Sequence, residues 1–274
     1  MQYVFEKQTL RELKKKEGLD KRTIKDHLDA YHVSQKKHTP RAVNLVADAL
    51  YFGERTDDTS WCAVAFRDPN EKENLWWDFG KTETTSIYLK GRVQLEQLGY
   101  TITSLTGDGF GGLRAAFLGI PFQMCQVHME RIITHGTTKK PQLEAGRALL
   151  ALGRILHETD RVTFTHYVYR YREQYGDFLN ERTTHPLTGE SFFTHDPLRR
   201  AFLSLLYFLP YLFTFELHSD IPRTTNSLEG HFSHIRDIVE VHRGMGRSHK
   251  EKVLSSIFLA STIAPTDEKL REIL

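Results

Sequence analysis

Residues 42–52 of the chain read AVNLVADALYF, a mainly apolar run that contains one acidic residue, Asp48. The β-branched and aromatic residues of this run predict a strand. Strands are depleted in Asp, and on a two-residue period Asp48 shares a face with Val46 and Leu50. A carboxylate on that face loses hydration unless cations or hydrogen-bond donors compensate it. Asp48 is therefore a candidate ligand, with a hydrogen bond to a loop at the strand edge as the alternative.

The segments after this run predict an α/β fold. Strands are expected at residues 60–66 and 74–79, so that three successive strands indicate an antiparallel meander. Residues 85–98 have apolar residues at largely helical spacing, and Gly99 closes this expected helix. The remaining expected elements are a strand at 102–106, a short helix at 113–118 and a strand at 122–127. The order βββαβαβ is that of a ribonuclease-H-like core.

Residues 139–217 are rich in Leu, Tyr, Phe and Arg and have helical spacing, which predicts an all-helical insertion. The apolar run 201–215 within it contains Pro210 and is closely flanked by charged residues. We interpret this short run as a buried helix rather than a membrane segment. An amphipathic helix is expected at 223–241, and a further helix begins near Ser248.

The N-terminal arm is basic, unlike the rest of the chain. Residues 1–41 contain 11 Lys or Arg and 6 Asp or Glu, a net charge of +5, whereas the remainder contains 26 and 29, a net charge of −3. Two short helices, at 8–16 and from 21 onward with Asp20 as N-cap, predict a small helix-turn-helix. The predicted DNA contacts lie near the start of the second helix: Lys21, Arg22, Thr23 and Lys25. A solvated basic helix surface would explain the charge alone equally well.

Length and composition indicate an ordinary globular protein. With 274 residues, of which 39% are hydrophobic, the chain can bury a large core. Its start has no apolar stretch behind basic residues, and two cysteines cannot form a disulfide framework, so we expect a reducing, cytoplasmic and nucleoid-associated location. The expected domains are the helix-turn-helix segment, the first part of the core, the insertion and the completion of the core: residues 1–38, 39–137, 138–221 and 222–274.

Asp108 follows the expected fourth strand and begins a glycine-rich turn into a short helix, with residues 107–112 reading GDGFGG. Open α/β sheets place their chemistry at such carboxyl ends. The six residues formally satisfy the dinucleotide pattern G-x-G-x-x-G. That interpretation is disfavoured because the strand is the fourth of the fold and because Asp108 would oppose a pyrophosphate. An ordinary Asp-Gly turn remains an alternative.

Two such aspartates favour a site for hard cations. Carboxylate oxygens suit Mg²⁺ or Mn²⁺, and an ion held by few carboxylates keeps positions open for a substrate phosphate. This is the arrangement of two-ion phosphoryl transfer, for which a third acidic residue is normally needed.

Residues 223–232, which read RTTNSLEGHF, resemble the glutamate helix of Mutator-like bacterial insertion-sequence transposases. The resemblance includes residues 43–48 and the segment Cys125-Gln126-Val127-His128, and it covers roughly residues 40 to 260. It implies that Glu229 is the third carboxylate after Asp48 and Asp108. Asp108 follows Asp48 by 60 positions, which fits four strands and a helix, and Glu229 follows Asp108 by 121 positions, which leaves room for the helical insertion of this family.

The resemblance implies a DDE transposase that cleaves DNA and transfers strands with two Mg²⁺ or Mn²⁺ ions. Its implied catalytic and metal-binding residues are Asp48, Asp108 and Glu229. Its implied partners are double-stranded DNA, as transposon ends and target, and further copies of the chain in a dimer or larger assembly on DNA, with no membrane. Nearby acidic rivals of Glu229 are Glu216, Asp220 and Asp237.

Cys125 and His128 could be half of a zinc site, but Cys62 is the only other cysteine, so zinc is disfavoured. The resemblance implies a supporting element or a DNA contact beside the active site. A buried thiol with a capped imidazole is the alternative.

Many hydrogen-bond donors surround Glu229 in the sequence, which suits contacts to phosphates. The predicted DNA contacts among them are Arg223, Asn226, His231 and Arg236. His234, His242, Arg243, Arg247 and Lys250 belong to the same group, of which only some are expected to touch DNA. A solvated helix surface is the alternative.

Three other functions remain open. A catalytically inactive, transposase-derived DNA-binding protein would keep the acidic residues without cleavage. A structure-selective nuclease or ribonuclease H on the same fold would cleave without strand transfer. A glycosidase with paired acids is less favoured because of the basic arm. The N-terminal portion is short for the resembled family, which affects the recognition of terminal repeats more than the chemistry.

Overall fold

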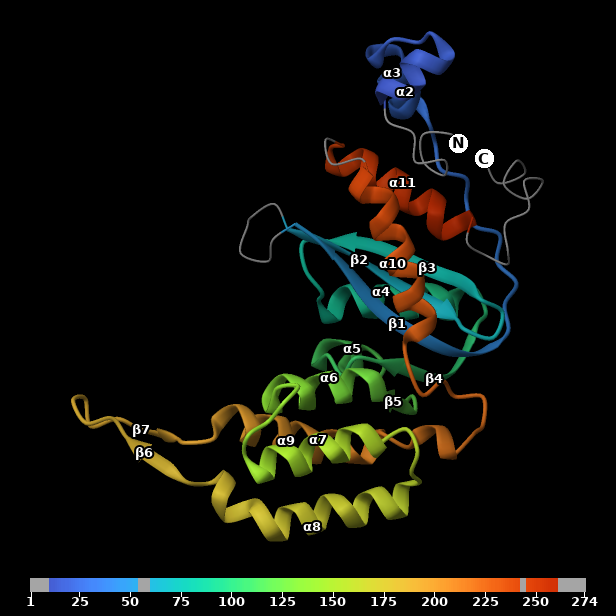
Figure 1. Ribbon diagram of the computed structural model, residues 1–274. Coiled ribbons are helices and arrows are strands. Elements are labelled where there is room, and N and C mark those ends of the chain that lie inside the picture. Colours follow the sequence, from blue (N-terminus) through green and yellow to red (C-terminus); the bar gives the residue numbers. More distant parts are fainter. Residues whose placement is uncertain (1–9, 54–59, 242–244, 261–274) are drawn as a thin grey trace. The chain divides into compact units, whose positions relative to one another are not determined.

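The computed structural model describes residues 10–53, 60–241 and 245–260 and shows an α/β protein (Figure 1). Five strands form one mixed sheet in the order β3-β2-β1-β4-β5. Strands β1, β2 and β3 are antiparallel neighbours, whereas β1, β4 and β5 run parallel. This order is consistent with the expected ribonuclease-H-like core.

The chain divides into two compact units, and β4 (Thr101–Gly107) contributes residues to both. The first unit comprises Met1–Thr103, Ala115–Leu118 and Asn226–Leu274. The second unit comprises Ser104–Arg114 and Gly119–Thr225. Each unit is described separately below.

The meander of the first unit matches the sequence-based expectation closely. β1 spans Ala42–Phe52, as predicted, while β2 spans Trp61–Asp68 and β3 spans Glu73–Gly80. Every residue of β2 is buried, because this strand lies between two others and both faces of the sheet are covered. Trp76 and Tyr100 are core residues.

Thr84 is the N-cap of helix α4 (Thr85–Gln97), and its side chain accepts a hydrogen bond from the N–H of Ile87 (3.3 Å). It packs closely on the sheet at Gly91, where an added Cβ would lie 2.6 Å from the rings of Phe66 and Trp76. Gly99 follows the helix with a φ of +94°, so the predicted glycine stop is confirmed.

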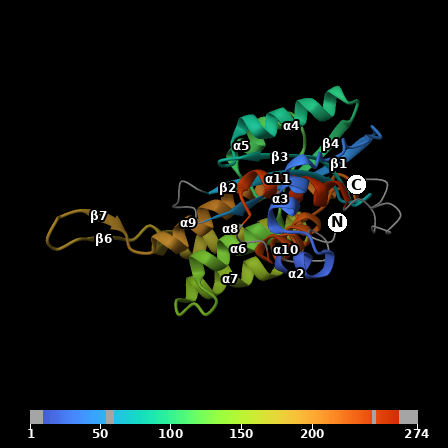
Figure 2. The same cartoon turned by 90° about the horizontal axis from the view of Figure 1, so that it is seen from above.

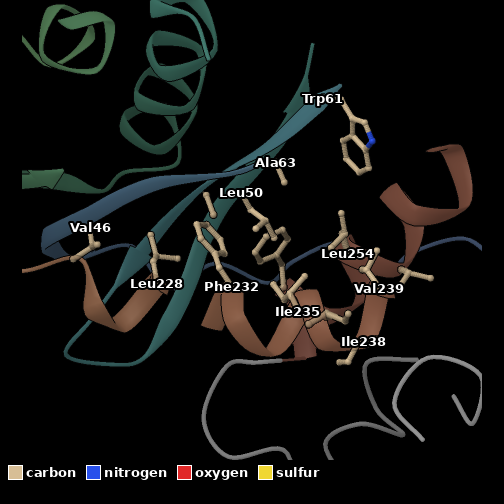
Figure 3. Packing of buried hydrophobic residues seen from close by; sticks show 14 of the residues in the cluster. Val46, Leu50, Trp61, Ala63, Leu228, Phe232, Ile235, Ile238, Val239 and Leu254 are labelled. Carbon is tan, nitrogen blue, oxygen red and sulfur yellow. The ribbon is translucent and has the colours of Figure 1, made fainter. Parts of the chain in front are cut away.

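Helices α10 (Asn226–Val241) and α11 (Arg247–Ala260) provide the apolar cluster of the first unit. Figure 3 shows that leucine, isoleucine and phenylalanine side chains of α10 lie against Val46, Leu50 and Ala63 of the sheet. The cluster also contains Ile24. The α10 residues in it are Leu228, Phe232, Ile235, Ile238 and Val239.

Two helices precede the sheet in the described part of the chain, α2 (Leu10–Glu17) and α3 (Lys21–Ala30). Asp20 is the N-cap of α3, as predicted, and accepts a hydrogen bond from the N–H of Thr23 (2.8 Å). Two side chains of α11 form hydrogen bonds with Asp29 at the end of α3. His249 Nε2 bonds to Asp29 Oδ1 (2.5 Å), and Lys252 Nζ donates to the Asp29 carbonyl (2.6 Å).

Residues 34–40 form a polar linker with neither helix nor strand, which ion pairs connect to the sheet. Lys36 forms an ion pair with Glu73 at the start of β3. Arg41, directly after the linker, pairs with Asp68 (2.7 Å) and Glu73 (2.8 Å). The ion pairs of Lys36 and Arg41 with Glu73 thus hold the segment between α3 and β1 against the sheet.

The second unit contains β5 (Phe122–Met124), which pairs in parallel with β4 through Thr106 and Gln123. The expected fifth strand at 122–127 was too long. The N–H of Cys125 still bonds the Gly107 carbonyl (2.8 Å), but the Cys125 carbonyl already accepts the first helical bond from Met129 (3.0 Å). Helix α6 therefore begins at Gln126.

The remainder of the second unit is mainly helical, as expected. It comprises α6 (Gln126–Thr137), α7 (Glu144–Ile155), α8 (Arg161–Leu179), α9 (Asp196–Phe208) and the short 3₁₀ turns η1 (Leu209–Tyr211) and η2 (Thr214–Glu216). The apolar run 201–215 is broken by Pro210 in η1 rather than forming one helix. No helix among the described residues is long and apolar enough to cross a membrane.

The prediction of an all-helical insertion was wrong in one respect, because a β-hairpin connects α8 to α9. Its strands are β6 (Arg182–Thr184) and β7 (Ser191–Phe193), and they extend beyond the ends of the two helices in both views (Figures 1 and 2). The strands have three residues each and are almost wholly exposed, so no alternation of buried and polar residues marks them in the sequence.

Candidate active site

Asp48 lies on β1, which has β2 on one side and β4 on the other. Val46 and Leu50, two residues away in each direction, are fully buried in the cluster with α10, whereas Asp48 is partly exposed. Its Oδ1 accepts a hydrogen bond from the N–H of Ala49 (2.8 Å). Because side chains alternate along a strand, Asp48 belongs to the face of the sheet that α10 covers.

Glu229 lies in the first turn of α10, next to the buried Leu228. Its side chain is partly exposed at the edge of the apolar stripe that faces the sheet. An acidic residue in a first helical turn is favourable because the helix dipole is positive there. The first unit therefore holds both Asp48 and Glu229 where α10 covers β1.

Asp108 belongs to the second unit and directly follows the last residue of β4. Its Oδ1 accepts a hydrogen bond from the N–H of Phe110 (2.9 Å), which closes the turn into α5 (Gly111–Ala116). Gly109 has a φ of +91°, and an added Cβ would lie 2.7 Å from Phe208 Cζ. Backbone conformation and close packing explain this glycine without a bound dinucleotide.

Cys125 and His128 of the second unit share a partner that the sequence did not indicate, Thr225. The thiol sulfur of Cys125 accepts from the N–H (3.3 Å) and the hydroxyl (3.4 Å) of Thr225. The same hydroxyl lies 3.4 Å from His128 Nδ1. Thr225 is fully buried and is the last residue before α10, so this group holds the chain at the point where the Glu229 helix begins.

The surroundings of Cys125 favour its thiolate. Burial raises the pKa of the thiol, but the hydrogen bonds from His128 and Thr225 lower it by more, so that the pKa lies below its ordinary value. Two further hydrogen bonds hold the segment that leads to Thr225. The N–H of Gln126 donates to the Arg223 carbonyl (3.1 Å), and the Thr106 hydroxyl donates to the Pro222 carbonyl (2.8 Å).

The predicted DNA contacts of α3 are mainly accessible. Arg22 and Lys25 are exposed, and Thr23 is partly buried with its N–H bound to Asp20. The side chain of Lys21 lies outside the described residues. Exposed cations on α3 leave a DNA contact available there.

The donors around Glu229 occupy different surroundings. Asn226 and Arg236 are exposed on α10, and exposed Arg223 lies with its guanidinium carbon 4.1 Å from the centre of the Phe215 ring. His242 and Arg243 lie outside the described residues. Arg247 is exposed and pairs with Glu251 (2.7 Å).

His231 is packed inside the first unit rather than displayed on it. Its Nε2 lies 3.1 Å from Asn74 Nδ2, and its ring meets Phe258 edge-on. Burial, with a smaller effect from the charge of Arg67, lowers the pKa of His231 to about 4. A neutral, packed imidazole of this kind contributes to the core, and its predicted contact with DNA stays a sequence-based prediction.

Sequence reasoning missed Thr225 and the aromatic surroundings of Asp108. A Thr directly before a helix is an ordinary capping signal, so nothing in the sequence distinguished Thr225 as the partner of a buried thiol.

Comparison with protein-family models gives no match to this chain, and comparison with curated proteins finds no match either.

Proposed function

We propose that the chain is a metal-dependent DDE transposase, which cleaves a phosphodiester at a transposon end and joins the freed 3′ hydroxyl to target DNA. The observation that carries this proposal is the placement of Asp48 on the central β1 strand and Glu229 on the helix that covers the same face. The mixed sheet around them has the strand order of a ribonuclease-H-like core.

The register of β4 supports Asp108 as the second carboxylate of this site. The N–H of Thr101 donates to the Arg41 carbonyl (3.0 Å), and the Thr103 hydroxyl donates to the Val43 carbonyl (2.9 Å). Each bond joins residues 60 apart, which is also the separation of Asp48 and Asp108. Asp108 directly follows β4, the strand next to β1 in the sheet order, and open α/β sheets place their chemistry at such carboxyl ends of strands.

The donor set fits hard divalent cations. All three proposed ligands are carboxylates, and Asp48 and Glu229 are partly exposed, which leaves them accessible to a phosphate substrate. When bound, two Mg²⁺ or Mn²⁺ ions would activate the attacking water or hydroxyl and offset charge on the leaving oxygen. The chain itself contributes the rigid strand and helix that hold the carboxylates in place.

The test uses substitutions that keep the size of each side chain: Asp48→Asn, Asp108→Asn and Glu229→Gln. Each should reduce Mn²⁺-dependent DNA nicking by more than about 100-fold, because even a residue that only supports a metal ligand contributes about 10- to 100-fold. DNA binding should persist. Asp237→Asn, an exposed acid on the same helix α10, is the matched control and should cleave normally. Normal nicking by Asp48→Asn or Glu229→Gln would refute the proposal.

A strand-transfer assay separates the proposed reaction from its nearest alternative. Labelled DNA ends should become joined to a target plasmid in the presence of Mg²⁺ or Mn²⁺. Cleavage without any joining would instead indicate a structure-selective nuclease on this fold, and DNA binding without cleavage would indicate a catalytically inactive derivative.

A further inference from the structure

In the second unit, Arg114 lies within a group of four aromatic rings. Its guanidinium carbon is 4.2 Å from the ring centre of Tyr211, 5.3 Å from Tyr207, 5.6 Å from Phe122 and 6.0 Å from Phe208. Its Nη1 donates to the Tyr207 hydroxyl (2.9 Å). No described carboxylate forms an ion pair with Arg114, so its positive charge is not neutralised by a neighbour.

Tyr207 is the exposed member of this group. Tyr207 is 61% exposed, although its hydroxyl is held by Arg114 and its ring meets Phe208 edge-on at 4.9 Å. An exposed ring that is already held in place loses little conformational freedom when it binds a planar group. Surface tyrosines without such contacts lack this advantage.

The aromatic group lies against the turn that carries Asp108. The Phe208 ring and the Met124 sulfur occupy the space beside Gly109, where an added Cβ would meet them at 2.7 and 2.8 Å. Gly109 directly follows Asp108 in the chain. Tyr207, through its contact with Phe208, is therefore attached to the same turn as the proposed second carboxylate.

We propose that Tyr207 is a stacking site for an unpaired DNA base close to the cleaved phosphodiester, with Arg114 supplying positive charge for the adjacent phosphate. This inference rests on the proposed function. Aromatic rings and unneutralised arginines are the two features with which proteins hold single strands, because every base has a stacking face and every nucleotide a phosphate. A base that leaves the duplex beside Asp108 would find both features on one rigid surface.

The experiment measures binding of a single-stranded thymidine oligonucleotide that carries one 2-aminopurine, at low salt and without divalent metal. Wild type should quench the fluorescent base on binding. Tyr207→Leu should weaken binding by about 5- to 100-fold and abolish the quenching, because stacking on one ring contributes that much. Tyr207→Phe, which keeps the ring, should stay close to wild type.

Tyr169→Leu is the matched control, since Tyr169 is 50% exposed on α8 of the same unit. It should bind and quench as wild type does. Thermal unfolding of each variant verifies that the fold is intact. Unchanged binding by Tyr207→Leu would overturn the inference. An equal loss of binding to the fully paired duplex would also overturn it, since Tyr207 would then contact the backbone rather than a base.

Failure of the inference can be told apart from failure of the proposed function. If wild type cleaves DNA but Tyr207→Leu binds and cleaves normally, only the stacking site is refuted. If wild type never cleaves with Mg²⁺ or Mn²⁺ but loses single-strand binding on Tyr207→Leu, the stacking site stands and the transposase proposal fails.

Discussion

Cys62 and Cys125 are both fully buried, yet their surroundings shift the two thiol pKa values in opposite directions. Burial on β2, with a smaller effect from the charge of Glu83, raises the pKa of Cys62 to about 11. Burial acts on Cys125 in the same sense, but His128 and Thr225 donate to its sulfur and leave a lowered pKa. Hydrogen bonding to the charged form, not burial, therefore decides the direction in which the pKa of Cys125 shifts.

Cys62 should make the protein less stable at high pH. The unfolded thiol ionises near its ordinary pKa of 9.0, whereas the folded thiol stays neutral until about pH 11, so the stabilising difference is lost as pH rises through this window. Cys62→Ala should remove a pH-dependent loss of about 2 kcal/mol between pH 9 and 11. Denaturant unfolding of both proteins across this range measures it, and parallel curves would contradict the assignment.

Thr225→Val should raise the pKa of Cys125, because the variant keeps the N–H donor but loses the hydroxyl donor to the sulfur. The lost hydrogen bond should also cost about 1 kcal/mol of unfolding free energy. Thr225→Ser, which keeps the hydroxyl, is the control. Ultraviolet titration of the thiolate measures the pKa, and Cys62, which ionises only near pH 11, does not overlap with it. Identical titrations of the Val and Ser variants would show that the hydroxyl is not a donor.

At the scale of elements, α4 depends on one glycine for its contact with the sheet. Gly91→Ala would place a methyl group 2.6 Å from the rings of Phe66 and Trp76, and such overpacking should cost about 1 to 3 kcal/mol. Gly176→Ala on α8, where nothing lies within 4 Å, is the control and should stabilise by up to about 1 kcal/mol. Thermal or denaturant unfolding compares them. Equal stability of Gly91→Ala and wild type would mean that α4 moves away from the rings at little cost.

The sequence predicted elements well where burial imposes a period and poorly where tertiary contacts decide. β1 was placed correctly because its apolar, β-branched and aromatic residues, such as Val46 and Leu50, are those that a buried strand requires. The end of β5 was misplaced because the apolar residues Cys125 and Val127 extend the strand-like pattern into α6. The hairpin β6–β7 was missed because exposed three-residue strands have no hydrophobic pattern to detect.

At the scale of the molecule, the sequence identified the three candidate carboxylates, but not the neighbours that give their surroundings a chemical character. Asp48 and Asp108 were distinguished by their positions within and after predicted strands, whereas Glu229 was indicated by the resemblance of residues 223–232 to a glutamate helix. No local signal in the sequence indicates the roles of Thr225 and Tyr207, because these roles come from partners that lie 100 and 93 residues away in the chain. Such contacts follow only from the packed fold.

The basic N-terminal arm leads to a prediction about DNA affinity. Arg22 and Lys25 are exposed on α3, while Ile24 between them is buried in the cluster with α10 and α11, so both charges can be reversed without exposing the core. If each contacts one phosphate, the double change Arg22→Glu and Lys25→Glu should weaken DNA binding. It should also reduce the slope of log affinity against log salt by about 2.

The control is the double change Lys139→Glu and Lys140→Glu, which alters the net charge equally at two exposed residues after α6. Fluorescence anisotropy over a series of salt concentrations measures both slopes. Each variant should keep wild-type nicking activity at low salt, since neither change touches the proposed carboxylates. Equal decreases in slope for the two variants would mean that overall charge, and not α3, holds the DNA.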